Sequence, residues 1–177
     1  MVSIEAVFLD RDGTIGGDGH FKHPRDFELY PYSAEAFRIL REKGLKLFSF
    51  TNQHRIGRGE VSINDFKKEF NSYGFDDVFI CPHRMEENCD CRKPKPGMLR
   101  NAAQSYDLKL ENCIVIGDVG STDMLAAEAV GAIKILVRTG WGNGSLHEYR
   151  HTWSEVDPDY IAEDLLDAVK WITEKLI

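Results

Sequence analysis

Short runs of apolar residues alternate along the chain with longer stretches in which apolar residues recur at helical spacing. The runs are nearly continuous in apolar residues, which is typical of strands buried on both faces of a parallel sheet. The alternation of such runs with amphipathic stretches predicts an α/β fold. We expect strands at residues 4–10, 45–51, 77–82, 112–118 and 133–139.

Capping and breaking residues bound the helices expected between these strands. Ser33 and Ser62 are predicted to cap helices that end at Gly44 and Gly74, and Pro96 suits the first turn of a third helix. The five expected helices therefore cover residues 33–44, 62–74, 96–107, 121–132 and 161–177.

Composition and charge exclude several classes of protein. The length of 177 residues suits a single domain spanning 1–177, and 42% hydrophobic with 29% charged residues is ordinary for a globular protein. A net charge of −7 disfavours a nucleic acid or an anionic membrane as partner. The first residues do not resemble a signal peptide, and no stretch of about 18 apolar residues occurs, so we expect a cytoplasmic protein.

Four of the five apolar runs end in a group of reactive residues. Carboxyl ends of parallel strands share one edge of the sheet, so these groups are expected to lie close together. Each group alone is common in turns and helix caps, but the four in this order are far more specific. They are "DRDGT" at 10–14, "TNQ" at 51–53, the cysteine cluster followed by "RKPK" at 92–95, and "GDVGSTD" at 117–123.

The segment after the third run has the spacing of a metal site. Cys81, His83, Cys89 and Cys91 form the pattern C-x-H-x5-C-x-C, a set of four ligands that leaves no position for water or substrate. Such closed sets bind structural zinc, so we predict a zinc loop over residues 81–91 with reduced thiols. The alternative is a loop of free thiols without metal. Cys113, inside an apolar run, is interpreted as a buried thiol.

Taken together, these motifs resemble those of the haloacid dehalogenase-like (HAD) phosphatases. "DRDGT", "TNQ", "C-x-H", "C-x-C-R-K-P" and "GD" are similar to subclass IIIA, the branch with histidinol-phosphate phosphatase and D-glycero-D-manno-heptose-1,7-bisphosphate phosphatase. The resemblance runs from about Val7 to Gly140. It implies a Rossmann-like parallel sheet with helices on both faces. No span between the motifs is long enough for a large cap domain.

The resemblance implies catalytic roles for Asp10, Asp12, Thr51 and Lys93. Asp10 would attack the phosphorus atom and form an aspartyl-phosphate, while Asp12 would protonate the leaving oxygen and later deprotonate the hydrolytic water. The Thr51 hydroxyl and the Lys93 ammonium group would bind the phosphoryl oxygens. Substrate-binding roles are expected for Asn52, for Arg92, and for Thr14, whose hydroxyl would also hold Asp12.

The same resemblance implies a catalytic Mg²⁺ beside the structural zinc. Its ligands would be Asp10, the backbone carbonyl of Asp12, Asp118, and Asp123 either directly or through water. The spacing from Asp118 to Asp123 is one residue longer than in some relatives. Val119 stands where these relatives often have lysine or arginine, which predicts the loss of a substrate contact.

Two segments near the catalytic motifs are interpreted from their position. The zinc loop ends next to Arg92 and Lys93, so zinc is expected to anchor these two residues. The segment 16–33 follows the nucleophile, and its basic side chains either cover the pocket or belong to a solvated connection. Those side chains are His20, Lys22, His23 and Arg25.

The predicted function is a Mg²⁺-dependent phosphomonoesterase that acts on a small phosphorylated metabolite. The motifs leave open whether the substrate is a sugar phosphate such as a heptose bisphosphate or histidinol phosphate. A phosphotransferase or mutase on the same scaffold is one alternative, and a catalytically silent, zinc-stabilised binding module is another. Neither a nucleic acid nor a membrane is expected as partner.

Overall fold

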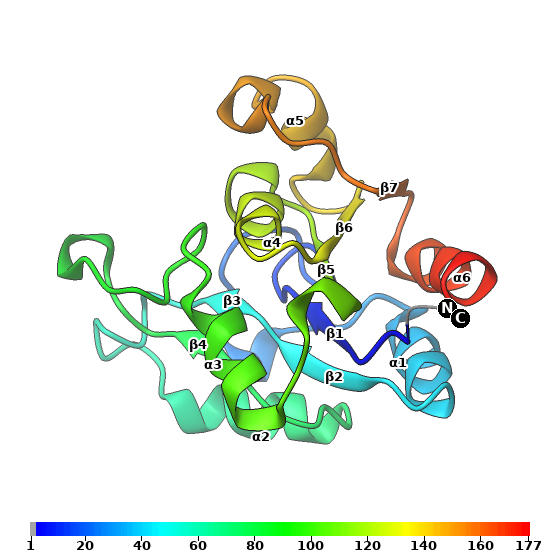
Figure 1. Cartoon of the computed structure of the whole chain (residues 1–177). Helices are drawn as coiled ribbons and strands as arrows, with labels where there is room; N and C mark the ends of the chain where they lie inside the picture. Colours follow the sequence, from blue (N-terminus) through cyan, green and yellow to red (C-terminus); the bar gives the residue numbers. More distant parts are fainter. Residues whose placement is uncertain (1–2) are drawn as a thin grey trace.

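A computed structural model describes residues 3–177 of the chain and has a parallel sheet at its centre (Figure 1). Its five strands lie in the order β2-β1-β5-β6-β7, and all four neighbouring pairs are parallel. The parallel α/β fold predicted from the apolar runs is therefore confirmed. The strands are β1 (Ala6–Leu9), β2 (Lys46–Ser49), β5 (Cys113–Gly117), β6 (Ile133–Val137) and β7 (Tyr160–Ala162).

Helices cover both faces of this sheet, as expected. Side chains of a strand point alternately to its two faces, so Val7 and Leu9 of β1 pack into one core, whereas Ala6 and Phe8 pack into the other. The first core contains side chains of α1 (Ser33–Glu42), α2 (Ile63–Ser72) and α6 (Leu165–Lys175). The second contains side chains of α3 (Gly97–Tyr106) and α4 (Leu125–Ala129).

Shorter elements complete the chain. A further short helix, α5 (Gly142–Leu146), follows β6. Short 3-10 helices span Pro24–Asp26, Met85–Glu87, Leu110–Asn112 and Arg150–Trp153. Within residues 3–177, the structure has no helix whose length and apolar character would let it cross a bilayer.

The apolar run at 77–82 adds no strand to the main sheet, contrary to the prediction, although an isolated parallel bridge between Phe48 and Asp77 joins it to β2. Instead, β4 (Ile80–Cys81) pairs with β3 (Thr51–Asn52) in a separate two-stranded sheet. Beside β2, side chains replace part of the ladder, because the Ser49 hydroxyl accepts from the Phe79 N–H at 2.8 Å. The pairing of β3 with β4 brings Thr51 and Asn52, which follow β2, next to the start of the cysteine loop.

The helix ends confirm some predicted signals and correct others. Ser62 caps α2, because its hydroxyl accepts from the Asp65 N–H at 3.1 Å. Gly44 and Gly74 follow α1 and α2 with φ of +78° and +81°, a conformation that glycine adopts without strain. Ser33 is not the cap of α1. It is the first residue of that helix, and its hydroxyl donates to the carbonyl of Ile15 at 2.7 Å.

Two further helix boundaries differ from the prediction. Pro96 precedes the first residue of α3 instead of lying in its first turn. The helix expected over 161–177 begins only at Leu165, because residues 160–162 form strand β7 at the edge of the sheet. Asp164 caps this helix, since its carboxylate accepts from the Asp167 N–H at 2.9 Å. With three residues, β7 is too short to produce a recognisable apolar run.

Candidate active site

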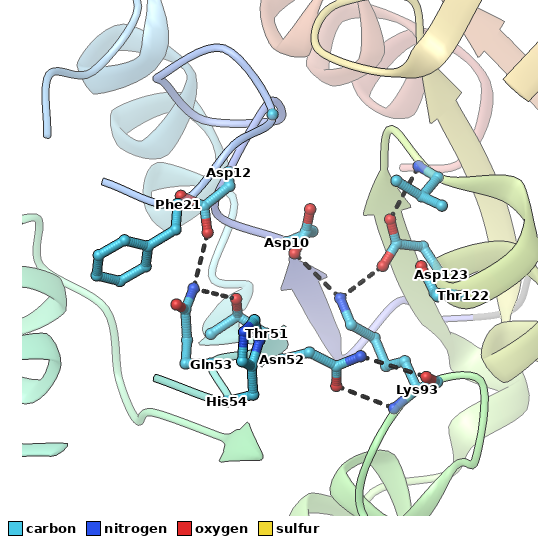
Figure 2. A pocket seen from close by; sticks show the side chains of 12 residues that line it. Asp10, Asp12, Phe21, Thr51, Asn52, Gln53, His54, Lys93, Thr122 and Asp123 are labelled. Carbon is cyan, nitrogen blue, oxygen red and sulfur yellow. Dashed lines mark hydrogen bonds and ion pairs between the residues drawn. The ribbon is translucent and has the colours of Figure 1, made fainter. Parts of the chain in front are cut away.

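A pocket of about 210 Å³ lies beyond the carboxyl end of β1 and beside β3 (Figure 2). It occupies the edge of the sheet where the reactive groups were expected to meet, and residues from all four of the groups line it or lie directly behind it. The residues predicted for the site that line this pocket are Asp10, Asp12, Thr51, Asn52, Lys93 and Asp123.

Lys93 forms the centre of the ion pairs in the pocket. Its Nζ donates to Asp10 Oδ1 at 3.0 Å and to Asp123 Oδ1 at 2.6 Å (Figure 2). It also donates to the carbonyl of Phe50 at 2.7 Å. Burial alone would lower the pKa of Lys93, but the charges of Asp10 and Asp123 raise it above its ordinary value. The ammonium group is therefore charged and lies beside the carboxylate predicted to attack the phosphorus atom.

Asn52 lines the pocket and fixes the main chain of Lys93. Its Oδ1 accepts from the Lys93 N–H at 3.0 Å, and its Nδ2 donates to the Lys93 carbonyl at 3.2 Å. Asn52 was predicted to bind the substrate. Both ends of its amide have partners on Lys93, so its side chain also ties β3 to the segment that carries the lysine, and the substrate contact stays a prediction.

Asp12 lies at the side of the pocket opposite Lys93, and both of its carboxylate oxygens have donors. Gln53 Nε2 donates to Asp12 Oδ2 at 2.7 Å, and Arg11 Nη1 donates to Asp12 Oδ1 at 2.7 Å. Burial raises the pKa of Asp12 to about 6, with the charge of Asp10 acting in the same direction and that of Arg11 opposing it. A carboxyl group with this pKa can both donate and accept a proton near neutral pH.

Thr14 does not hold Asp12, so that prediction is wrong. The chain turns back at Gly13, whose φ is +87°, and the fully buried Thr14 hydroxyl donates to Asp118 Oδ1 at 3.2 Å. It also lies 3.4 Å from Asp10 Oδ2. Thr14 is absent from the pocket lining and fully buried, so it does not reach the space where the sequence predicted that it would contact the substrate.

Three carboxylates gather at the base of the pocket, two of them in its lining and Asp118 behind it. Asp10, Asp118 and Asp123 each offer an oxygen atom, and these atoms lie within 4.8 Å of one another. Burial and the neighbouring carboxylates raise the pKa of Asp118 above its ordinary value, and burial raises the pKa of Asp123 to about 7. Lys93 offsets part of this negative charge. Three buried oxygen ligands with an excess of negative charge fit a divalent cation of the Mg²⁺ type.

The Asp118 carboxylate fixes this cluster against two loops. Its Oδ2 accepts from the Trp141 N–H at 2.8 Å. A Cβ atom at Gly13 or at Gly140 would collide with the same oxygen, so the loops after β1 and β6 approach it only because both residues are glycine. The remaining predicted ligand, the backbone carbonyl of Asp12, stays a prediction.

The long spacing between Asp118 and Asp123 is absorbed by a π-helical turn over Gly120–Met124. In this turn the Leu125 N–H donates to the Gly120 carbonyl, five residues back. A π-turn accommodates one extra residue without shifting the helix that follows. Asp123 therefore still reaches the cluster. The neighbouring Val119 lines the pocket, and its apolar side chain offers no charge to a substrate.

The four predicted zinc ligands converge at one point of the cysteine loop. Cys81 Sγ lies 3.5 Å from Cys89 Sγ and 3.5 Å from His83 Nδ1, which in turn lies 3.2 Å from Cys91 Sγ. All four ligand atoms lie within 4.8 Å of one another. Zinc bonds of about 2.0–2.3 Å in a tetrahedron place their ligand atoms about 3.5–3.8 Å apart, so the arrangement fits a zinc ion.

Arg92 lies outside the pocket that contains Asp10. It lines a neighbouring pocket of about 330 Å³ together with Lys95 and residues of the cysteine loop, and Lys93 and Thr122 line both pockets. The Nη1 atom of Arg92 is buried and has no hydrogen-bond partner within residues 3–177. The predicted substrate contact of Arg92 would therefore be made from the adjoining pocket.

The segment 16–33 contributes residues to the pocket lining, but they differ from the basic residues that the sequence singled out. Gly19 and Phe21 line it, and the indole N–H of Trp141 donates to the Gly19 carbonyl at 3.2 Å, which ties the segment to the loop after β6. The basic side chains expected to cover the pocket are absent from its lining; they are His20, Lys22, His23 and Arg25.

Sequence reasoning missed further residues around the pocket. Phe21 and His54 line it without belonging to a recognisable pattern, whereas Thr122 lay inside the motif "GDVGSTD" without being assigned a role. Gln53 was part of the "TNQ" motif, and its position directly after two predicted contacts was a usable signal. Arg11, between the two aspartates predicted to be catalytic, contacts Asp12 from the side away from the pocket. No spacing rule identifies its distant partner, Glu69.

Comparisons with known proteins agree with this arrangement. A family model described as HAD-hydrolase-like matches residues 90–168. The D-glycero-β-D-manno-heptose-1,7-bisphosphate 7-phosphatase of Vibrio cholerae is 40% identical over 153 residues, which cover 76% of this chain and 82% of that protein. The enzyme of the same name from Helicobacter pylori is 40% identical over 137 residues, which cover 71% and 79%.

A solved structure has the same fold over nearly the full length. The D,D-heptose 1,7-bisphosphate phosphatase of B. bronchiseptica, complexed with magnesium and phosphate, superposes with a TM-score of 0.85 at 27% identity. The match covers 97% of this chain and 99% of that one. By its motifs, its fold and its relatives, the chain belongs to the haloacid dehalogenase-like phosphatases, enzymes that hydrolyse phosphate esters.

Proposed function

We propose that this protein is a Mg²⁺-dependent phosphatase that releases the 7-phosphate of D-glycero-β-D-manno-heptose 1,7-bisphosphate. The observation that carries the proposal is the meeting of Asp10, Asp12 and Lys93 in one pocket, where Asp10 also forms a cluster of buried carboxylates with Asp118 and Asp123. The names of the relatives supply the sugar. Histidinol phosphate, the other substrate expected from the sequence, has no support among the relatives described above.

In the proposed reaction, an Asp10 oxygen attacks the phosphorus atom while the bond from phosphorus to the sugar oxygen breaks. The Lys93 ammonium group stabilises the negative charge of the phosphoryl oxygens, and the Thr51 hydroxyl donates to them. Mg²⁺ held by Asp10, Asp118 and Asp123 would neutralise further negative charge on the phosphoryl group.

Asp12 moves the protons in both half-reactions. Its carboxyl proton passes to the departing sugar oxygen, which leaves as a neutral hydroxyl group. The Asp12 carboxylate then takes a proton from the water that attacks the aspartyl-phosphate, and Asp10 is regenerated with release of inorganic phosphate. The pKa of about 6 suits a group that must be protonated in the first step and ionised in the second.

We further propose that the cysteine loop binds a structural zinc ion that anchors Lys93. The loop is joined to the pocket at two places. Cys81 lies in β4, which pairs with β3, and Asn52 of β3 holds the main chain of Lys93. The Lys95 side chain also donates to the Cys89 carbonyl at 2.7 Å. Zinc would fix the loop at a point two residues before Lys93.

Phosphate release from a panel of phosphorylated metabolites tests the proposed function. The panel contains the β-heptose bisphosphate, its α-anomer, histidinol phosphate and smaller sugar phosphates, each with Mg²⁺. We expect the highest kcat/KM with the β-heptose bisphosphate, loss of activity on mild chelation and recovery with Mg²⁺ while zinc remains bound. A preference for histidinol phosphate would contradict the proposed substrate. Transfer of phosphate to an added sugar in place of water would contradict the proposed hydrolysis and favour a phosphotransferase.

Asp12→Asn is expected to slow substrates with poor leaving groups more than those with good ones. Loss of a general acid costs about 10²–10⁴-fold for an alkyl phosphate, whereas an aryl oxygen leaves without protonation. The measurement compares kcat/KM for a sugar phosphate and for p-nitrophenyl phosphate, because kcat/KM reports the steps up to the aspartyl-phosphate and not the hydrolysis step that both substrates share. An equal loss with both substrates would contradict the role of Asp12 in the departure of the leaving group.

A further inference from the structure

Arg11 lies between the two catalytic aspartates in the sequence, and its side chain is fully buried. Its guanidinium group donates to Glu69 with two nitrogens, from Nε to Oε2 at 2.8 Å and from Nη2 to Oε1 at 2.9 Å. The third nitrogen, Nη1, donates to Asp12 Oδ1 at 2.7 Å. The guanidinium group therefore bridges a carboxylate of α2 and the carboxylate predicted to move protons.

The surroundings of Arg11 leave its guanidinium plane little freedom. The carbon atom of the group lies 3.8 Å from the centre of the Phe27 ring and 4.9 Å from that of Phe66. Glu69 is held in turn, because the Tyr73 hydroxyl donates to its Oε1 at 3.2 Å. A two-pronged arginine–carboxylate contact between aromatic rings fixes the direction of every remaining N–H group.

The two donors to Asp12 differ in their access to the pocket. Gln53 lines the pocket, where it borders the space that a substrate would enter, whereas Arg11 contacts the carboxyl group from the protein interior. Only the Arg11 contact is linked through Glu69 to a helix of the scaffold. The orientation of Asp12 relative to the leaving oxygen therefore depends on a contact that the substrate does not touch.

We propose that Arg11, held by Glu69, is a positioning residue that fixes the Asp12 carboxyl group in the orientation required for proton transfer. The inference rests on the role proposed above for Asp12. Arg11 would then contribute to catalysis through Asp12, although it does not contact the substrate itself. A pair that merely stabilised the fold would need no contact with Asp12.

The test removes both charges of the pair at once in the variant Arg11→Met/Glu69→Met. Removal of Arg11 alone would leave a buried, unpaired Glu69, whereas replacement of a whole buried ion pair by apolar side chains is often tolerated. We expect the double variant to unfold near the temperature of the parent. Its kcat/KM for a sugar phosphate, which reports formation of the aspartyl-phosphate, should fall about 10- to 100-fold through misplacement of Asp12, with kcat/KM for p-nitrophenyl phosphate nearly unchanged.

A second variant covers the case in which the double variant does not fold. Arg11→Lys keeps the positive charge but cannot hold Glu69 with two nitrogens and Asp12 with a third. It should show the same selective loss with the sugar phosphate. Arg38→Met is the matched control, because Arg38 pairs with Glu35 and Glu42 on the exposed face of α1, and it should leave both rates unchanged.

The same substitutions in an Asp12→Asn background show whether Arg11 acts through Asp12. We expect no further loss there, since residues that act as a unit are not additive. An unchanged sugar phosphate rate in the folded variants, an equal loss with both substrates, or a full additional loss in the Asp12→Asn background would each overturn the inference. If Asp12→Asn itself showed no dependence on the leaving group, the proposed function of Asp12 would fail first.

Discussion

Asp10→Asn is expected to lower the rate of phosphate release by about 10⁴-fold or more, with sugar phosphates and aryl phosphates alike. The amide is nearly the same size as the carboxylate, and its oxygen can still accept from Lys93. It cannot, however, form the aspartyl-phosphate, so a good leaving group does not rescue the reaction. The measurement is phosphate release with Mg²⁺ under saturating substrate.

The stability of the same variant separates this chemical effect from misfolding. Asp10 is one of three buried carboxylates whose oxygens lie within 4.8 Å of one another, so removal of its charge reduces their mutual repulsion. Metal-free Asp10→Asn should therefore unfold at a temperature no lower than that of the metal-free parent. Residual activity above about one per cent of the parent would contradict the role of Asp10 as the nucleophile.

Lys93→Met is expected to combine a large loss of activity with a loss of stability. The phosphoryl oxygens would lose their main positive side chain, which we expect to cost about 10²–10³-fold in kcat. Asp10 and Asp123 would also lose the ammonium group that pairs with them, and an uncompensated buried charge costs about 3–5 kcal/mol of unfolding free energy. Addition of Mg²⁺ should restore part of the stability but not the activity.

Cys89→Ala tests the anchoring role of the zinc loop and is compared with Lys93→Met. It should release zinc, loosen the segment before Lys93 and lower kcat about 100-fold, because a displacement of about 1 Å at a catalytic group has that effect. Lys93→Met should keep its zinc. Zinc content, phosphate release and unfolding temperature are measured on both variants. A Cys89→Ala protein without zinc but with full activity and unchanged unfolding temperature would contradict the anchoring role of the loop.

The sheet could be predicted where apolar runs were long enough to stand out. Four of the five runs form strands of the central sheet, whereas the run at 77–82 joins β2 through an isolated bridge at Asp77, beyond which the Ser49 hydroxyl takes the hydrogen bond of the Phe79 N–H. Strand β7 was not predicted, because it has three residues and a helix begins only three positions after its end. Local patterns indicate strands, but they do not show which edge each strand joins.

The site could be predicted where a residue type and a strand end coincide. Asp10, Asp12 and Lys93 meet in one pocket because parallel strands end at the same edge. The hydroxyl of Thr14 and the amide of Asn52 point to other partners than expected, because their directions depend on turns that the sequence does not specify. Arg11 was overlooked for a related reason: its partner lies 58 residues away.

Detection of a phosphoryl group on Asp10 tests the central claim most directly. Asp12→Asn should still be phosphorylated by an aryl phosphate, but the aspartyl-phosphate should break down slowly, because the water has lost its general base. The reaction is stopped with acid, and the digested protein is analysed by mass spectrometry. The account predicts one phosphoryl group on Asp10. Product formation with no phosphorylated residue, or with the phosphoryl group on another residue, would contradict it.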